Sequence, residues 1–345
     1  MLKSANKSGF SIIVLTVIVI LASACPAAEP GSADAYKINK LLGRGINLGN
    51  ALEAPKEGDW GVMLQDEYFD LIKNAGFNSI RLPVRWDNKA LDKPPYTIDP
   101  NFFNRVDWAV KNAQSRNLAL VFNMHNYYDL YKDPNNHRER FIAIWKQIAE
   151  HYKDYPQTLL FEFLNEPQDK LGIPEWNSLL KETLTVVRQS NPGRIIVIGP
   201  ANYNDIYKIK NLEIPKDDRN IIVTFHYYSP YRFTHQGAHW VADSNNWLGM
   251  KWGSEGEKRL VAKDFDLAAK WSKENDRPIF LGEFGVFEKA DMDSRVRWTK
   301  CVADTAIERD FGISYWEFCA LFGLYDPQAK TWRKELLNAV IPPKP

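Results

Sequence analysis

The sequence predicts an α/β protein built as one (β/α)8 barrel, also called a TIM barrel. Eight short and nearly continuous apolar runs follow one another after residue 41, and longer amphipathic stretches separate most of them. Continuous apolar runs of this length are typical of strands that are buried on both faces. Nearly every run also ends in a side chain that can donate, accept or transfer a proton. An open doubly wound sheet is the alternative.

The elements alternate in the order that the barrel requires. The predicted strands are residues 42–48, 79–83, 118–124, 159–164, 194–199, 221–226, 278–284 and 313–318. Between them, the apolar periodicity predicts helices at residues 64–75, 101–116, 139–151, 174–189, 258–275 and 293–309. Eight strands alternating with helices predict one barrel domain over residues 41–341.

The ends of the strands favour the barrel over the open sheet. Their polar or aromatic groups are Asn47, Arg81, His125, Asn165 with Glu166, His226 with Tyr228, Glu283, and Trp316. In a barrel all these ends meet at one mouth, whereas an open sheet would spread them along an edge. No Gly-x-Gly-x-x-Gly motif follows a strand and opens a helix, so a dinucleotide site has no support.

Composition and charge exclude several classes of protein. The chain has 345 residues, of which 45% are apolar, and its 44 basic side chains nearly balance its 43 acidic ones. This apolar content excludes disorder, and the balanced charge gives no footprint for binding a phosphate backbone. We expect a monomer without a nucleic-acid partner.

The first residues have the features of an export signal. Lys3 and Lys7 precede an apolar run at residues 10–21, and small residues lead up to Cys25. We therefore expect residues 1–24 to be a signal peptide and residues 25–40 a tether. The apolar run is too short to favour a retained membrane anchor. Cys25 leaves two alternatives open: a lipid-anchored protein acylated at this residue, or a freely secreted one.

Two carboxylates hold matching positions in the predicted barrel. Glu166 follows the fourth strand and Glu283 ends the seventh. A lone glutamate at a strand end is usually a solvated rim residue, but two of them can face each other across the mouth. Glycoside hydrolysis needs such a pair, because one carboxyl group protonates the leaving oxygen while the other attacks or activates water.

The ordered motifs resemble glycoside hydrolase family 5. They span residues 44–318 at positions 44–50, 80–83, 123–125, 164–167, 225–228, 281–285 and 315–318. Residues 233–240 and 251–253 are further similar to thermostable bacterial members that act on β-1,4-glucans and β-mannans. The resemblance implies a retaining endo-β-1,4-glycosidase of cellulose, mixed-linkage glucan and glucomannan. Alternatives are a β-mannanase, an exo-acting enzyme, or a non-catalytic sugar-binding lipoprotein.

The resemblance also implies roles for individual residues. Glu166 becomes the general acid/base and Glu283 the nucleophile, with their carboxyl groups about 5 to 5.5 Å apart. The residues expected to support them are Arg81, His125, Asn165, His226 and Tyr228. Those expected to contact the substrate are Asn47, Asn126, His235, Trp240 and Trp316. Asn126 stands where many relatives carry a second histidine, which puts fine substrate preference in doubt.

Two further expectations concern metal binding and the aromatic residues of the loops. The six histidines form neither a His-x-His pair after a strand nor a His-Glu-x-x-His motif, so we expect no metal and no other cofactor. Flat indoles bind the apolar faces of sugar rings. Besides Trp240, the loop residues Trp60, Trp86, Trp247 and Trp252 are therefore candidates for flanking subsites.

Overall fold

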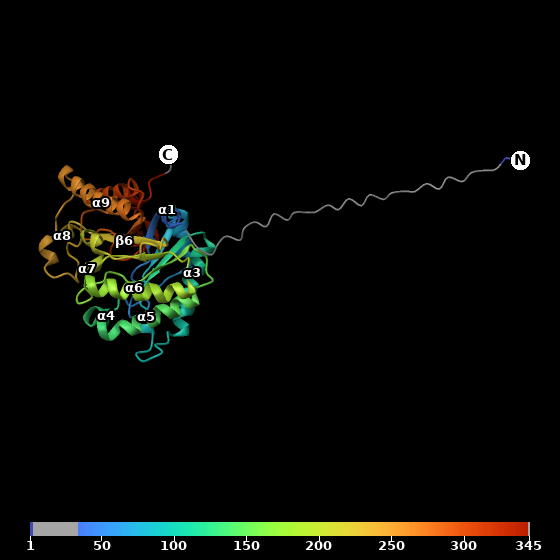
Figure 1. Ribbon diagram of the computed structural model, residues 1–345. Helices are drawn as coiled ribbons and strands as arrows, with labels where there is room; N and C mark the ends of the chain where they lie inside the picture. Colours follow the sequence, from blue (N-terminus) through green and yellow to red (C-terminus); the bar gives the residue numbers. More distant parts are fainter. Residues whose placement is uncertain (3–33, 344–345) are drawn as a thin grey trace. The chain divides into compact units, whose positions relative to one another are not determined.

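The computed structural model describes residues 1–2 and 34–343 (Figure 1). Residues 3–24 of the expected export signal and Cys25 lie outside the described residues. Eight parallel strands close into a barrel in sequence order, which confirms the predicted fold and rules out the open sheet. The strands are β1 (Arg44–Asn47), β2 (Ser79–Leu82), β3 (Ala119–Asn123), β4 (Leu159–Glu162), β5 (Ile196–Ile198), β6 (Ile221–Tyr227), β7 (Ile279–Phe284) and β8 (Gly312–Tyr315).

Helices surround the strands, and the six predicted ones are present with shifted ends. They are α2 (Asp66–Ala75), α3 (Pro100–Ser115), α5 (Pro134–His151), α6 (Ile173–Ser190), α9 (Glu255–Asn275) and α10 (Met292–Ile307). Further helices are α1 (Ala35–Leu42), α4 (Tyr128–Lys132), α7 (Ala201–Asn204), α8 (Tyr231–Thr234) and α11 (Lys334–Val340), with 3-10 turns η1 (Asp87–Lys89), η2 (Ile206–Asn211) and η3 (Ser244–Trp247). A small antiparallel pair, β9 (Tyr325–Asp326) and β10 (Thr331–Trp332), follows β8.

The start of the fold differs from the prediction. Leu42 belongs to α1 rather than to the first strand, and α1 occupies residues that were expected to be tether. The Asp34 side chain accepts hydrogen bonds from the Tyr36 and Lys37 amides, which caps the helix. Gly43 then turns the chain into β1 with a φ of 49°. Because an apolar run continues from the helix into the strand, hydropathy alone could not separate them.

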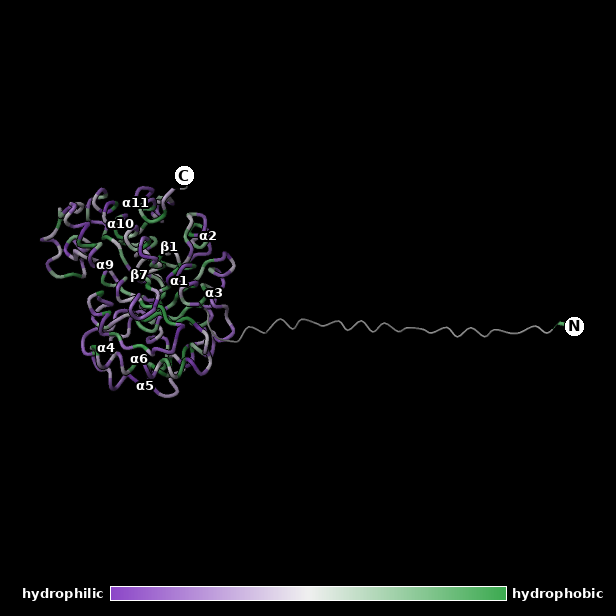
Figure 2. The backbone as a smooth tube through the Cα atoms, turned by 45° about the horizontal axis from the view of Figure 1, so that its top comes forward, coloured by the Kyte–Doolittle hydropathy of each residue, from purple (hydrophilic) through white to green (hydrophobic). Residues whose placement is uncertain are grey.

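Side chains that point inward from alternate strand residues fill the barrel. Val121, Leu160, Val197, Ile222 and Phe280 come from different strands and form one buried cluster, which Leu42 of α1 joins. The intervening strand residues belong to the larger apolar cluster shared with the helices. In Figure 2 the strands at the centre are the more hydrophobic part of residues 34–343. The interior is therefore packed.

A polar layer lies nearer the carboxyl ends of the strands. Asn47, Arg81, Asn123, Glu162 and Thr224 are all buried. Arg81, Asn123 and Glu162 stand two residues after inward positions of their strands, so they point into the barrel as well. Parallel pairing aligns Asn47 with Arg81 and Asn123 with Glu162. The barrel thus places hydrogen-bonding groups directly beneath its mouth.

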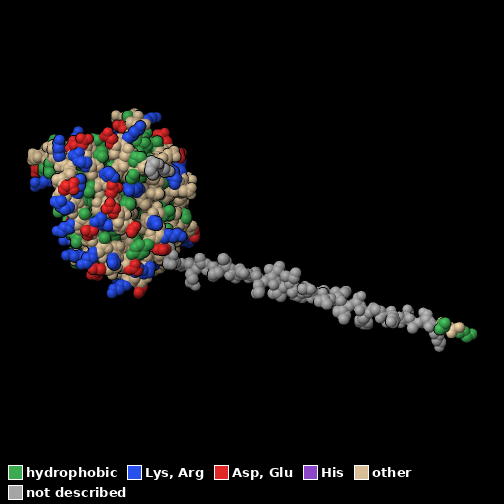
Figure 3. Space-filling model, turned by 90° about the horizontal axis from the view of Figure 1, so that it is seen from above, with side chains coloured by type: hydrophobic (Ala, Val, Ile, Leu, Met, Phe, Trp, Pro, Cys, Tyr) green, Lys and Arg blue, Asp and Glu red, His purple; other side chains and the backbone are tan. Residues whose placement is uncertain are grey.

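Charge on the outside is mixed. Basic and acidic side chains are interspersed over the face seen in Figure 3. None of the helices in the described part of the chain is long and apolar enough to cross a bilayer.

Arg194 links several segments at the amino-terminal end of the barrel strands, opposite the mouth. Its buried guanidinium donates to the carbonyl groups of Tyr152, Tyr155, Pro156 and Leu159. Removing the guanidinium would leave these carbonyl groups without their donor, which is costly where they are buried.

We expect Arg194→Met to lower the free energy of unfolding by about 3 kcal/mol. Chemical denaturation monitored by circular dichroism measures the change. The matched control is Arg138→Met, because Arg138 forms a more exposed ion pair with Glu182 and should contribute less than about 1 kcal/mol. Equal effects of the two substitutions would contradict the role given to Arg194.

Candidate active site

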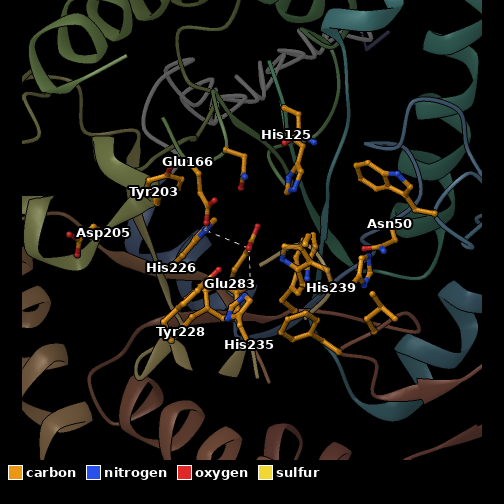
Figure 4. Close-up of a pocket in the computed structure, with 18 of the residues that line it drawn as sticks. Asn50, His125, Glu166, Tyr203, Asp205, His226, Tyr228, His235, His239 and Glu283 are labelled. Atoms are coloured by element: carbon orange, nitrogen blue, oxygen red, sulfur yellow. Dashed lines mark hydrogen bonds and ion pairs between the residues drawn. The ribbon is translucent and has the colours of Figure 1, made fainter. Parts of the chain in front are cut away.

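An open pocket of ≈ 1240 Å³ lies at the carboxyl ends of the strands (Figure 4). Glu166 and Glu283 both line it, and Figure 4 shows their side chains pointing toward each other beside His226. The pocket is lined by residues from most of the loops that follow the strands. This is the end of a (β/α)8 barrel where active sites occur.

Arg81 on β2 organises the floor of the pocket. Its Nε and Nη2 donate to the two oxygens of Glu162, at 2.6 and 2.7 Å. Its Nη1 donates to Asn47 Oδ1 at 2.9 Å and to Glu283 Oε1 at 2.6 Å. Nη2 also donates to Asn165 Oδ1 at 2.7 Å. All five N–H groups of this buried guanidinium therefore have acceptors.

Glu283 is held by two donors. Arg81 binds its Oε1, and the Tyr228 hydroxyl donates to its Oε2 at 2.9 Å. Burial raises the pKa of Glu283, while the positive charge of Arg81 opposes the rise. Both contacts stabilise the negative form of the carboxylate. A fixed and ionised carboxylate is suited to nucleophilic attack.

Glu166 has a different environment. Its Oε1 lies 2.7 Å from His226 Nδ1, and the guanidinium of Arg81 does not bind it directly. Burial raises the pKa of Glu166 to about 7, with a smaller opposing contribution from Arg81. Burial also lowers the pKa of His226 to about 4, so this ring is neutral near pH 7. A carboxyl group that titrates near neutrality can both give and take a proton.

The two carboxylates are close together. One oxygen of Glu166 and one of Glu283 lie within 4.8 Å of each other, together with a nitrogen of His226. Retaining glycosidases hold their carboxyl groups about 5–5.5 Å apart, whereas inverting ones leave about 6.5–9.5 Å for a water molecule. A nearest approach of 4.8 Å or less is consistent with the retaining arrangement and leaves less room for an intervening water molecule than the inverting one.

Among the described residues, the side chains of Glu166, His226 and Glu283 lie close enough together to hold a metal ion. The donor set fits a cation poorly, because both oxygens of Glu283 already accept hydrogen bonds from Arg81 and Tyr228. The adjacent guanidinium would also repel a cation. The arrangement is better suited to proton transfer and nucleophilic attack.

An indole lines the same pocket as the carboxylate pair. Trp316, directly after β8, stacks against His125 with ring centroids 5.5 Å apart and an interplanar angle of 5°. A side chain on Gly49 would meet the Trp316 ring at 2.8 Å, so glycine allows the ring to lie there. Asn165 also lines the pocket, and because its oxygen binds Arg81, its amide nitrogen is the group that can reach a ligand.

Most residues expected to contact the substrate do line the pocket. These are Asn126, His235, Trp240 and Trp316, joined by the loop residue Trp60. Trp240 is 49% exposed, so its ring is available to a ligand. The residues Trp86 and Trp252 are instead buried in the core, and Trp247 packs against Tyr231 outside the pocket lining.

The prediction for Asn47 is wrong. Asn47 is completely buried, and its amide donates to the carbonyl groups of Gly282, Ser314 and Tyr315. It fastens β1 to β7 and β8 below the mouth and presents its oxygen to Arg81. A polar residue near the end of a strand can serve the barrel itself, and its position in the sequence does not reveal this.

Sequence reasoning also missed several residues of the site. Glu162 neutralises Arg81 beneath the pocket, and Asn50, Tyr203 and Tyr231 line its walls. A signal for Glu162 was present, because a charged residue interrupts the apolar run of the fourth strand. Tyr203 and Tyr231 lie in short elements after β5 and β6 that have no clear periodicity.

A (β/α)8 barrel whose mouth holds two closely spaced carboxylates beneath exposed aromatic rings defines a glycoside hydrolase. Residues 43–321 match the model of the family described as "Cellulase (glycosyl hydrolase family 5)". The chain belongs to this family.

Solved and curated relatives agree with this assignment. The chain is 51% identical to Thermotoga maritima Cel5A in complex with mannotriose, with a TM-score of 0.88 over 89% of this chain and 100% of that chain. The same neighbour has been solved with cellobiose, also at 51% identity. The chain is 38% identical to Endoglucanase H of Acetivibrio thermocellus over 92% of its own length, but it spans only 35% of that protein. It is 29% identical to Endoglucanase B of Clostridium cellulovorans, over 88% of this chain and 75% of the relative.

Proposed function

We propose that the chain is a retaining endo-β-1,4-glucanase in which Glu283 is the nucleophile and Glu166 the general acid/base. The observation that carries the proposal is the asymmetric pair of carboxylates within 4.8 Å. Arg81 and Tyr228 donate to the carboxylate of Glu283, whereas among the described residues the carboxyl group of Glu166 is hydrogen-bonded only to neutral His226. Two carboxyl groups in different environments can take different roles.

Two displacements would complete the reaction. Glu283 attacks the anomeric carbon while Glu166 gives its proton to the glycosidic oxygen, so the C–O bond to the leaving sugar breaks. The ester formed at Glu283 is neutral. Loss of this negative charge makes the ionised form of Glu166 more favourable, and Glu166 then takes a proton from the water that cleaves the ester.

The walls of the pocket support cleavage within a chain. In Figure 4, Tyr203 and Asn50 lie on opposite sides of the carboxylate pair, so a polymer could extend in both directions. Exposed Trp60, Tyr128, Tyr203 and Trp240 offer apolar surfaces to successive sugar rings. This lining favours endo-action over removal of single sugars from an end.

We propose β-1,4-glucan as the main substrate, with mixed-linkage glucan, glucomannan and β-mannan also accepted. The neighbour Cel5A has been solved with cellobiose and with mannotriose, which supports substrates that contain glucose or mannose units. We expect the amide nitrogen of Asn165 to bind the 2-hydroxyl, the group whose orientation differs between glucose and mannose. Asn126 adds a donor and an acceptor to the same pocket.

We also propose that the enzyme is exported and anchored by a lipid at Cys25. The support is in the sequence alone: a short basic region, an apolar run at residues 10–21 and small residues before Cys25. A cell-surface position would suit an enzyme whose substrate is a polymer too large to enter a cell.

The roles of the two carboxylates are tested by substitution. We expect Glu283→Ala to abolish turnover, and Glu166→Ala to slow it by at least about 100-fold on substrates whose leaving group needs a proton. Azide should give a β-glycosyl azide with Glu166→Ala and an α-azide with Glu283→Ala, as NMR of the products would show. Glu274→Ala, at an exposed position on α9, is the control and should behave as wild type. A β-azide from the Glu283 variant would reverse the assignment.

The mode of cleavage is tested by comparing viscosity with reducing ends. On carboxymethylcellulose, viscosity should fall well before reducing ends accumulate, because internal cuts shorten the polymer most. Initial rates on mixed-linkage glucan, glucomannan and galactomannan, measured side by side, rank the substrates. Monosaccharide release from the first minutes with little loss of viscosity would show exo-action instead.

The anchor is tested by labelling. Labelled palmitate should enter the wild-type protein expressed with its leader in a bacterium, and Cys25→Ser should lose the label. Cys301→Ser is the matched control and should retain it. Label absent from the wild type would identify a freely secreted protein.

A further inference from the structure

We propose that Asn204 is a positioning residue that keeps the proton of His226 on Nδ1, where it is donated to Glu166. The inference rests on the acid/base role proposed above for Glu166. Asn204 does not line the pocket, so it would act only through His226.

The contacts of His226 define its tautomer. A neutral imidazole has one donor nitrogen and one acceptor nitrogen. The amide nitrogen of Asn204, a donor, lies 3.2 Å from His226 Nε2, so Nε2 is the acceptor. The remaining proton must then be on Nδ1, which lies 2.7 Å from Glu166 Oε1 and 3.5 Å from Glu283 Oε2. The ring therefore directs its one proton at the carboxylate pair.

The backbone around Asn204 is built to hold this amide. Residues 202, 203 and 204 have φ values of 66°, 64° and 51°, which is unusual for three consecutive residues without glycine. The amide of Tyr203 donates to the carbonyl group of Pro167, next to Glu166, at 3.1 Å. Asp205 forms a bridge with His226. The turn is thereby hydrogen-bonded to the residue after Glu166 and bridged to His226.

The side chain of Asn204 is completely buried, and a glycine makes room for it. A Cβ atom on Gly199 would lie 2.1 Å from Asn204 Oδ1. Within the described residues, Oδ1 has no hydrogen-bond partner. A strained backbone and a buried unsatisfied oxygen both cost stability, and such costs are typical of positions that serve a function.

The tautomer matters because the two forms act on Glu166 in opposite ways. A proton on Nδ1 stabilises the ionised carboxylate and so opposes the rise in its pKa that burial causes. With the proton on Nε2, a lone pair would face Glu166 and favour its protonated form. The other titratable groups around Glu166 and His226 are Arg81, His125, Tyr131, Glu162, Tyr203, Asp205, Tyr228, Tyr231 and Glu283. A substitution at residue 204 leaves all of these side chains unchanged.

Two substitutions should move the pH profile in opposite directions. Asn204→Gly tolerates the left-handed backbone and frees Nε2, so the basic limb of kcat/KM should shift to higher pH. Asn204→Asp keeps the shape but places a carboxylate that accepts a hydrogen bond from Nε2–H, so a second proton on His226 is stabilised, the ring becomes cationic and the limb should shift to lower pH. We expect shifts of about half a pH unit or more, measured on a cello-oligosaccharide, whose leaving group needs a proton.

Asn39→Asp is the matched control. Asn39 is buried on α1, its amide donates to the carbonyl groups of Ile279 and Asp310, and its Oδ1 also lacks a partner in the described part of the chain. This variant should lose stability without moving the limb. Near-UV circular dichroism identifies the variants that remain folded.

The inference would be overturned if the basic limbs of both Asn204 variants stayed at the wild-type pH or moved in the same direction. Failure of the proposed function has a different signature: a Glu166→Ala variant that keeps the wild-type basic limb would show that Glu166 is not the titrating acid. The two failures are therefore separable in one set of measurements.

Discussion

The buried guanidinium of Arg81 is the interaction on which the rest of the site depends. It lies on one strand and binds side chains from β1, β4 and β7, together with Asn165 just beyond β4, and none of its N–H groups is left over. A lysine could not replace it, because a single ammonium group cannot bind Glu162 in bidentate fashion and reach three other acceptors. Packing alone would leave these side chains free to rotate. Arg81 fixes their orientation.

The charges around Arg81 do not cancel. One positive charge lies against two carboxylates, Glu162 and Glu283, and the pair of ions with Glu162 is fully buried. The small excess of negative charge beneath the mouth makes a third ionised carboxylate unfavourable. Glu166 is the least strongly bound of the three, so it is the one that retains a proton. Burial is the largest cause of the raised pKa of Glu166, and the charge of Glu162 adds to the rise while that of Arg81 opposes it.

The sequence allowed the fold and the principal pair to be predicted because both depend on repeated local patterns. Apolar runs marked the eight strands, and Glu166 and Glu283 stood at the ends of two of them. Asn47 was misjudged because its role depends on which carbonyl groups face it across β7 and β8. Leu42 was misplaced because helix and strand are joined without a polar break. Asn204 was not predicted, because an Asn-Tyr-Asn sequence is compatible with a left-handed turn but does not indicate which side chain the turn presents to His226.

The carboxylates of the site and the aromatic residues proposed to bind sugar rings belong to different parts of this molecule. Arg81, Glu162 and Glu283 are on strands locked into the barrel, whereas Trp60, Tyr203, Tyr231 and Trp240 are on the connecting segments. Insertions and replacements in the segments would leave the strand positions undisturbed. Natural variation, or laboratory recombination of loops, can therefore alter which polysaccharide is recognised while the side chains on the strands stay unchanged.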